Sequence, residues 1–332
     1  MPSGKAWLVL RSAVYVHNTD RRRVGDNIIQ VRNLTKRYGE LAAVDNISFD
    51  AHSGEILGIL GPNGSGKTTT IKSILGILKY QSGTITVKEM DPAACRRKFL
   101  RITGAVLEGA RNIYWYLSPR ENLLYFAGIR GFSDREVSRN IPELLEALEL
   151  SDVADKEVRQ FSSGMKQKCS IACAMVHDPE ILILDEPTLG LDVETGLKIR
   201  EWLRSVCEKK GKTILITSHD MDFIEAVCDR VLIIRKGKKI FCDSVDSLKE
   251  KFSGKFFRLI LDSPPDEVFL NELDRIAEVS AEGTLLDIRL CSLSVLLPVL
   301  ELIHGSRYKL LDLKSIEKNL EDIFLELVRK EE

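Results

Sequence analysis

The 332-residue sequence predicts an α/β fold with a buried parallel sheet, and three features predict it. Short apolar runs at 56–60, 181–184 and 213–217 have the composition of strands covered on both faces. Segments with helical character, at about 69–78 and 194–209, follow the first two runs. A glycine-rich loop joins the first run to its helix. Strands that alternate with helices in this way are typical of a parallel sheet.

Changes in composition divide the chain into three parts. Residues 1–26 contain the basic cluster Arg21-Arg22-Arg23 and are interpreted as a disordered, solvated extension. Residues 27–245 are predicted to form the main domain, in which about 109–160 is a helical lobe. Two runs with β-type alternation open this domain and predict an antiparallel β flap beside strand 56–60. Residues 250–332 mix short strands and helices, which predicts a small C-terminal α+β accessory domain.

The glycine-rich loop at 61–68 matches the pattern G-x-x-x-x-G-K-[ST] at every fixed position. Such a loop points successive backbone N–H groups at phosphate oxygens, and the following helix adds its positive dipole end. Lys67 is then expected to reach the β- and γ-phosphates of a nucleotide, and the Thr68 hydroxyl to ligate Mg²⁺. The residues assigned to the nucleotide here are Gly61, Pro62, Asn63, Gly64, Ser65, Gly66, Lys67, Thr68 and Thr69.

Two adjacent carboxylates, Asp185 and Glu186, end the second apolar run. Buried carboxylates are costly unless a cation or a reacting group meets them. Because neighbouring strand residues point in opposite directions, we expect different roles: Asp185 as a Mg²⁺ ligand and Glu186 as the group that polarises water. His219 follows the third run, which should lie parallel beside the second, so it is expected to contact the γ-phosphate.

Aromatic residues at two places have alternative interpretations. Tyr38 precedes the phosphate loop, and its spacing is consistent with stacking on a base or with core packing. Tyr114-Trp115-Tyr116, in the lobe, is either a surface that docks a partner or part of the lobe core, and the core is preferred. A third segment, 161–167, is a turn of small residues that opens a helix, which is another anion-binding geometry.

Composition narrows the functional classes. Lys and Arg number 48 against 49 Asp and Glu, so no global basic field predicts nucleic-acid binding. No run approaches the roughly 18 apolar residues that a membrane helix needs. Arg11 interrupts the apolar N-terminal stretch, which argues against a signal peptide. Seven widely spaced cysteines favour a reducing compartment, so the cytoplasm is expected.

The ordered motifs resemble the nucleotide-binding subunit of ATP-binding-cassette (ABC) transporters. The resemblance covers roughly residues 27–245 and rests on Tyr38, the GPNGSGKTT loop, FSSGM, ILILDEP, LGLD and His219. It implies a P-loop NTPase cassette that works as a head-to-tail dimer with two ATP molecules between the subunits. The C-terminal LEDIFLEL also resembles the tail of exporter-type ATPases that pair with a separately encoded permease.

The resemblance implies a role for each matching position. Tyr38 would stack on adenine, Glu186 would act as the general base, and His219 would link the attacking water to the γ-phosphate. Mg²⁺ would be contacted by Thr68, Asp185 and Glu108. Ser162 and Gly164 would clamp the ATP of the opposite subunit, and Asp192 would bridge the two sites. Three positions depart from the family pattern: Glu108 stands where Gln is usual, Ser163 replaces Gly, and Met165 replaces Gln. These departures put the metal dependence, rate and coupling in question.

The function expected from this resemblance is ATP hydrolysis that drives export through an integral-membrane permease, on the cytoplasmic face of the membrane. The partner subunit is either a second copy or a related cassette. A soluble ABC ATPase acting on ribosomes or DNA is the alternative, disfavoured because the chain has one phosphate loop and neither coiled-coil nor zinc insertions. A module that binds ATP without hydrolysing it is disfavoured by Glu186 and His219. The cargo would contact the permease, so this chain does not name it.

Overall fold

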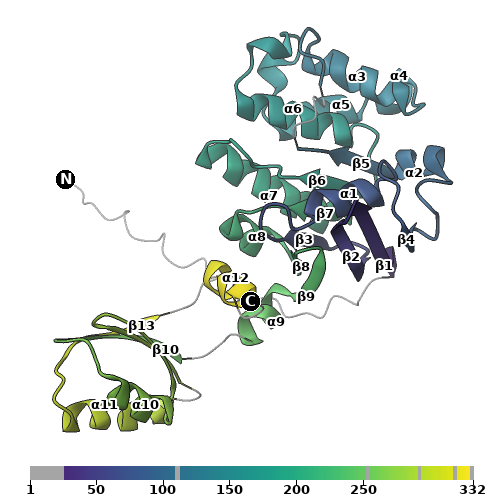
Figure 1. Cartoon of the computed structure of the whole chain (residues 1–332). Coiled ribbons are helices and arrows are strands. Elements are labelled where there is room, and N and C mark those ends of the chain that lie inside the picture. Colours follow the sequence, from purple (N-terminus) through teal and green to yellow (C-terminus); the bar gives the residue numbers. More distant parts are fainter. Residues whose placement is uncertain (1–25, 109–112, 252–254, 291–292, 317–319, 330–332) are drawn as a thin grey trace, which may run out of the picture.

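The structure, a computed structural model, describes residues 26–108, 113–251, 255–290, 293–316 and 320–329. The expected N-terminal extension lies outside these residues except for Asp26. Figure 1 shows a cassette of sheets and helices, with a helical lobe at one end and a smaller sheet-and-helix unit at the other. The mixed α/β architecture predicted from the sequence is confirmed.

A six-stranded sheet forms the centre of the cassette. Its first five strands are parallel, and the last pairs antiparallel with its neighbour. Strands β3 (Ile56–Leu60), β6 (Ile181–Asp185) and β7 (Thr213–Thr217) are buried along their whole length, as the apolar runs predict. The order across the sheet is β5 (Thr103–Val106), β6 (Ile181–Asp185), β7 (Thr213–Thr217), β3 (Ile56–Leu60), β8 (Arg230–Arg235) and β9 (Lys238–Ser244).

The predicted β flap is a second, antiparallel sheet in the order β2-β1-β4. Strands β1 (Asn27–Tyr38) and β2 (Leu41–His52) form a hairpin that turns at Gly39-Glu40, and β4 (Ser82–Val87) pairs with β1. Apolar residues of the flap pack with side chains of β3, β6, β7 and β8 and with helices α1 (Lys67–Ile74) and α2 (Arg96–Ile102). The turn between β8 and β9 links β2 to the glycine loop, because the Asp45 amide donates to the Gly237 carbonyl at 2.7 Å and the Gly237 amide donates to the Ser65 carbonyl at 3.0 Å.

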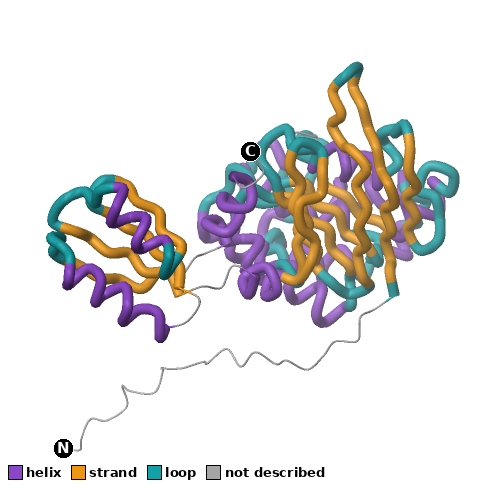
Figure 2. The backbone as a smooth tube through the Cα atoms, turned by 60° about the horizontal axis from the view of Figure 1, so that its bottom comes forward, coloured by secondary structure: helices purple, strands orange, loops and turns teal. Residues whose placement is uncertain are grey.

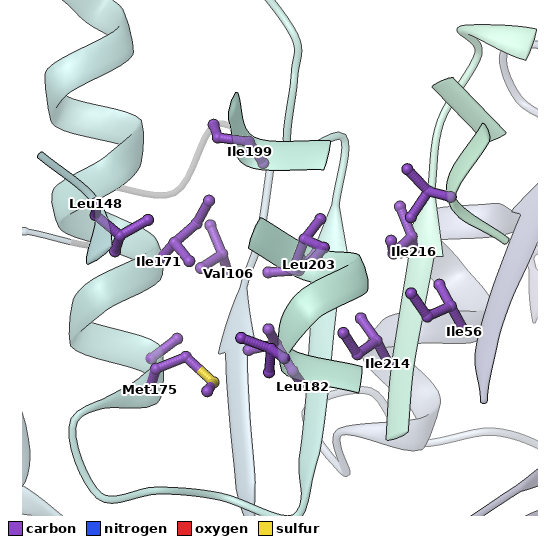
Figure 3. Close-up of a cluster of buried hydrophobic side chains, with 14 of the residues drawn as sticks. Ile56, Val106, Leu148, Ile171, Met175, Leu182, Ile199, Leu203, Ile214 and Ile216 are labelled. Atoms are coloured by element: carbon purple, nitrogen blue, oxygen red, sulfur yellow. The ribbon is translucent and has the colours of Figure 1, made fainter. Parts of the chain in front are cut away.

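The opposite face of the central sheet is covered mainly by helices α6 (Ser163–Met175), α7 (Val193–Lys210) and α8 (Met221–Val227). Figure 3 shows Ile171 and Met175 of α6 and Leu203 of α7 facing the sheet residues Val106, Leu182 and Ile214. All of these side chains are buried, and such close-packed apolar layers fix the angle between helices and sheet.

The helical lobe begins with a well-capped helix, α3 (Pro119–Ile129). Ser118 and Glu121 form a reciprocal capping box, and Pro119 occupies the first turn, where it needs no N–H partner. The rest of the lobe packs around this helix and around α6. It comprises α4 (Asp134–Val137), α5 (Asn140–Ala147) and the short 3₁₀ turns Ser151–Val153 and Val158–Gln160.

The aromatic trio of the lobe lies at its surface, which corrects the preferred sequence interpretation. Tyr114, Trp115 and Tyr116 are 49%, 45% and 76% exposed. Each ring has polar or charged neighbours at the surface. The Tyr114 and Tyr125 hydroxyls share a hydrogen bond, and the cationic groups of Lys166 and Arg159 lie over the rings of Trp115 and Tyr116. The lobe core is instead built from aliphatic residues such as Leu123 and Leu145.

Beyond β9, helix α9 (Val245–Lys251) still packs on the cassette through Val245 and Leu248. A four-stranded antiparallel sheet then follows, ordered β11-β12-β10-β13, with a βαββαβ chain order and its own core. Its helices cover one face of the sheet (Figure 2). The elements are β10 (Lys255–Leu261), α10 (Glu267–Asp274), β11 (Glu278–Glu282), β12 (Leu285–Leu290), a 3₁₀ turn (Leu293–Val295), α11 (Leu296–Gly305) and β13 (Leu310–Ile316).

The final helix, α12 (Leu320–Arg329), returns to the cassette. Leu320, Ile323 and Phe324 are buried in the cassette core cluster, and the Leu320 amide donates to Glu225 of α8 at 3.4 Å. The sequence pattern assigns this helix to the accessory domain, whereas its apolar face packs against α8 and α9. Among the described residues, none of the helices has both the length and the apolar character needed to span a bilayer.

Candidate functional site

The glycine loop lies between the end of β3 and the start of α1, as expected from the sequence. Gly66 is in the left-handed region (φ 110°), and a Cβ there would lie 2.3 Å from the Ala43 carbonyl of the flap. A Cβ at Gly61 would lie 2.2 Å from the Ile234 carbonyl. Both positions therefore require glycine, and the loop can curl tightly against β2 and β8.

Lys67 projects back over this loop. Its Nζ donates to the Gly61 carbonyl at 2.7 Å and to the Pro62 carbonyl at 3.3 Å. Burial lowers the pKa of Lys67, while the nearby carboxylates Glu186, Asp185 and Glu108 act in the opposite direction. The ammonium is thus held above the loop, where the polar groups of a phosphate chain would satisfy it.

Asp185 lies at the carboxyl end of β6, behind Thr68. One carboxylate oxygen accepts hydrogen bonds from the Thr217 and Thr68 hydroxyls, the latter at 3.3 Å. The other oxygen, Asp185 Oδ2, is buried and has no hydrogen-bond partner. A buried acceptor without a partner is costly. A small hard cation beside Thr68 Oγ1 would remove this deficit, so these two side chains fit Mg²⁺.

Glu186 and His219 face each other at the ends of neighbouring parallel strands. His219 Nδ1 lies 2.9 Å from Glu186 Oε2. The Glu186 side chain is only 8% exposed, whereas that of His219 is 59% exposed. The Glu186 backbone has φ 51°, which is unusual for a non-glycine residue, and its amide donates to both the carbonyl and the hydroxyl of Thr217. The strand ends therefore fix the position of this carboxylate.

A cleft of about 880 Å³ collects most of the residues predicted for the nucleotide. All nine loop residues from Gly61 to Thr69 line it, together with Tyr38, Glu108, Glu186 and His219. Tyr38 is 51% exposed and has Lys36 Nζ 4.9 Å from its ring centroid. Core packing of Tyr38 is thereby excluded, which leaves a ring face available to a ligand.

Asp185, which is buried at the end of β6, does not line this cleft. Three further predicted residues are absent from its lining: Ser162, Gly164 and Asp192. They lie together on another part of the surface, which we call the signature surface. Ser162 caps α6 by accepting a hydrogen bond from the Met165 amide at 3.2 Å, and Asp192 caps α7 by accepting one from the Thr195 amide at 2.9 Å. Both helix N-termini are thus presented side by side.

The sequence interpretation missed other residues that shape the cleft. The Thr217 hydroxyl donates to the Asp185 carboxylate, and both the hydroxyl and the carbonyl of Thr217 accept from the Glu186 amide. A polar residue at the end of an apolar strand was the signal available in the sequence. Leu41, Ala43, Leu189 and Met221 also line the cleft. Glu321 and Phe324 of α12 line it too, and no local pattern could have placed a helix 250 residues downstream beside the phosphate loop.

Comparison with known families identifies this arrangement. The family model described as "ABC transporter" matches residues 44–189. The Nod factor export ATP-binding protein I of Burkholderia lata is 36% identical over 308 residues, which is 91% of this chain and 97% of that protein. The chain belongs to the ABC transporter family. Its cassette binds ATP and hydrolyses it.

Further relatives of this ABC subunit agree on the cassette. The Nod factor export ATP-binding protein I of Sinorhizobium fredii is 41% identical over 223 residues, spanning 67% of this chain but 64% of that protein. A solved ATP-binding subunit of an ABC transporter superposes with a TM-score of 0.62 and 30% identity, covering 68% of this chain and 93% of the other. The P-loop NTPase cassette fold is therefore confirmed.

A dimeric ATP-binding cassette in a post-hydrolysis state, bound to ADP and phosphate, is also similar. It shares 26% identity with this ABC subunit at a TM-score of 0.58, and the match covers 65% of this chain and 98% of that cassette. The similarity seen in the sequence motifs therefore extends to the three-dimensional structure of the whole cassette.

Proposed function

We propose that this ABC subunit dimerises around ATP and powers export through a separately encoded integral-membrane permease. The second cassette is a further copy or a related chain. Relatives named as Nod factor export proteins support export, and the dimeric cassette supports pairing. In this proposal the chain lies on the cytoplasmic face of the membrane, bound to its permease.

Dimerisation around ATP is supported most strongly by one observation: the signature surface is separate from the cleft. The cleft is lined by the phosphate loop, Glu186 and His219, but not by Ser162 or Gly164. Helix N-termini are ready-made anion sites, and α6 presents one on this other surface. A second cassette, turned head to tail, would bring its Ser162 and Gly164 to the γ-phosphate and Asp192 to the boundary between the sites. Tyr38 would stack on adenine.

The residues of the cleft account for hydrolysis. Glu186 accepts a proton from a water molecule while the water oxygen attacks the γ-phosphorus. The bond between the γ-phosphorus and the oxygen that bridges it to the β-phosphate breaks, which releases ADP and phosphate. His219 orients Glu186 through the 2.9 Å contact and, from its place in the cleft lining, would reach the γ-phosphate of a bound ATP. Lys67 stabilises the negative charge of the β- and γ-phosphates. Mg²⁺, held by Thr68 and Asp185 with Glu108 at the cleft wall, would supply charge neutralisation.

A surface for the permease is available on the helical lobe. Tyr114, Trp115, Tyr116 and Tyr125 are exposed together, and Ile129 of the same helix as Tyr125 is 62% exposed. Monomeric proteins rarely expose contiguous apolar patches without a partner. The patch lies close in sequence to Glu108, so a change at the metal site could be transmitted to the permease through this part of the lobe.

Co-purification tests the partner. The tagged chain is expressed in its native host, membranes are solubilised in mild detergent, and co-purifying proteins are identified. We expect a multi-spanning membrane protein in stoichiometric amount, and less of it with Tyr116→Ala. The matched control is Val268→Ala, an exposed apolar residue of the accessory domain. Recovery with ribosomal or DNA-bound partners and no membrane protein would instead support a soluble ATPase and contradict transport.

A further inference from the structure

Glu149 occupies a backbone position that normally belongs to glycine. Helix α5 ends in a Schellman motif, in which the Leu150 amide donates to the Leu145 carbonyl at 2.7 Å and the Glu149 amide to the Glu146 carbonyl at 3.0 Å. This motif requires a left-handed residue, and Glu149 has φ 56°. Glycine adopts this conformation without steric cost. Glu149 therefore has a side chain at a position where glycine would have the lower steric cost.

The Glu149 carboxylate joins two helices outside its own. A single oxygen, Glu149 Oε2, accepts hydrogen bonds from Lys168 Nζ of α6 at 2.7 Å and from Lys198 Nζ of α7 at 3.1 Å. These two bonds lower the pKa of Glu149, that from Lys168 most. The Lys168 side chain is only 10% exposed, so its ammonium depends on this carboxylate more than a solvated lysine would.

The same two helices also touch at their N-termini, on the signature surface. A Cβ at Gly164 would lie 3.1 Å from Thr195 Cγ2, and the Ser163 hydroxyl donates to the Gly190 carbonyl at 3.3 Å. Asp192 accepts two hydrogen bonds from Thr195. Lys168 follows Gly164 by about one helical turn, and Lys198 follows Thr195 by about one turn. Contacts at two levels fix the angle between α6 and α7.

We propose that Glu149 is a positioning residue that aligns Ser162 and Gly164 with Asp192, so that the signature surface meets the ATP of the opposite cassette as one rigid unit. The proposal rests on the proposed function, because only a dimer brings this surface to a nucleotide. Glu149 itself touches neither nucleotide nor metal in this arrangement. It acts through α6 and α7, and its effect falls on the partner's site.

Substitution by glycine separates positioning from folding. Glu149→Gly removes the carboxylate but suits the left-handed backbone, so relief of backbone strain offsets part of the cost of leaving Lys168 without its partner, and the protein is expected to stay folded. We expect kcat for ATP hydrolysis to fall about tenfold, in keeping with the strong dependence of rate on sub-ångström alignment. The affinity of the monomer for ATP should not change. Glu146→Gln, an exposed carboxylate on the same helix, is the matched control and should keep the wild-type kcat.

Mixed dimers test whether the effect acts across the interface. In a dimer of one wild-type chain and one Glu186→Gln chain, only the site containing the wild-type Glu186 hydrolyses ATP, and the Glu186→Gln chain contributes the signature surface to it. We expect Glu149→Gly to lower the rate when placed in the Glu186→Gln chain, and to lower it much less in the other chain.

Three results would overturn the inference: an unchanged kcat in Glu149→Gly, an equal loss from either chain of the mixed dimer, or a lower Tm accompanied by weaker ATP binding, which would indicate only a structural role. Failure of the proposed function has a different signature. If the wild-type protein hydrolyses ATP with no dependence on a second cassette, the dimer and the inference that depends on it both fall.

Discussion

At the residue scale, the strained backbone of Glu186 is the feature that the sequence could least reveal. The DEP motif predicts two carboxylates at a strand end, and the structure has them there. The left-handed conformation of Glu186 and the two bonds from its amide to Thr217 depend on the neighbouring strand. Backbone strain of this kind persists only where the surrounding structure over-determines it, and it gathers at functional sites.

His177 gives a residue-scale prediction for stability. It is 6% exposed just after α6, and its ring lies 5.4 Å from that of Phe132. Burial, and secondarily the charge of Arg130, lowers the pKa of His177 to about 4. The unfolded chain, with a histidine pKa of about 6.5, therefore binds a proton first as the pH falls. Stability is then lost between about pH 6.5 and pH 4.

His177→Leu should remove this loss. At pH 5 the wild type is expected to be destabilised by roughly 2 kcal/mol relative to pH 7 through this residue, and the leucine variant should lack that component. Urea unfolding of both proteins at the two pH values measures it. An equal drop in the free energy of unfolding for both proteins would show that His177 is not the group responsible.

At the scale of elements, the apolar runs predict β3, β6 and β7 well, because a strand that is buried on both faces consists almost entirely of apolar residues. No comparable signal marks α10 or β11 in the sequence. Strand β11 is an edge strand whose residues are exposed or half-buried, so its polar sequence lacks the alternation that marks a strand. The sequence of α12 has the apolar spacing of a helix, but its packing on α8 depends on tertiary contacts.

Phe324 tests the docking of α12. Its side chain is buried in the cassette core and also lines the nucleotide cleft. Phe324→Ala removes a ring whose burial is worth about 3 kcal/mol or more in a core. Leu320 and Ile323 are the other buried residues described for this helix, so a short apolar face holds it to the cassette. We therefore expect α12 to undock rather than the cassette to unfold. Hydrogen exchange should then show lost protection in α12 with β3, β6 and β7 unchanged.

The control for this experiment is Leu297→Ala, which truncates an apolar side chain on α11 that is 61% exposed. It should leave the exchange of α12 unaltered. Uniform loss of protection across the central sheet in Phe324→Ala would contradict independent docking of the helix.

At the scale of the molecule, the sequence predicted a main domain before an accessory one, but not the path of the chain between them. The βαββαβ unit is inserted between α9 and α12, both of which pack on the cassette (Figure 1). Local patterns cannot show such a return, because the contacts join residues that are far apart in sequence. The pairing of β6 with β7, which brings Asp185 and Glu186 beside His219, could be predicted from the rule for parallel strands.

In the proposed function, hydrolysis in this cassette depends on Glu186 as the general base, and the release of phosphate measures that role. The purified protein is given ATP and Mg²⁺, and phosphate release is compared with that of Glu186→Gln at matched nucleotide occupancy. Loss of a general base should lower the rate at least about a hundredfold, with ATP affinity retained. Equal phosphate release from the two proteins would contradict the assignment of Glu186 and the account of hydrolysis built on it.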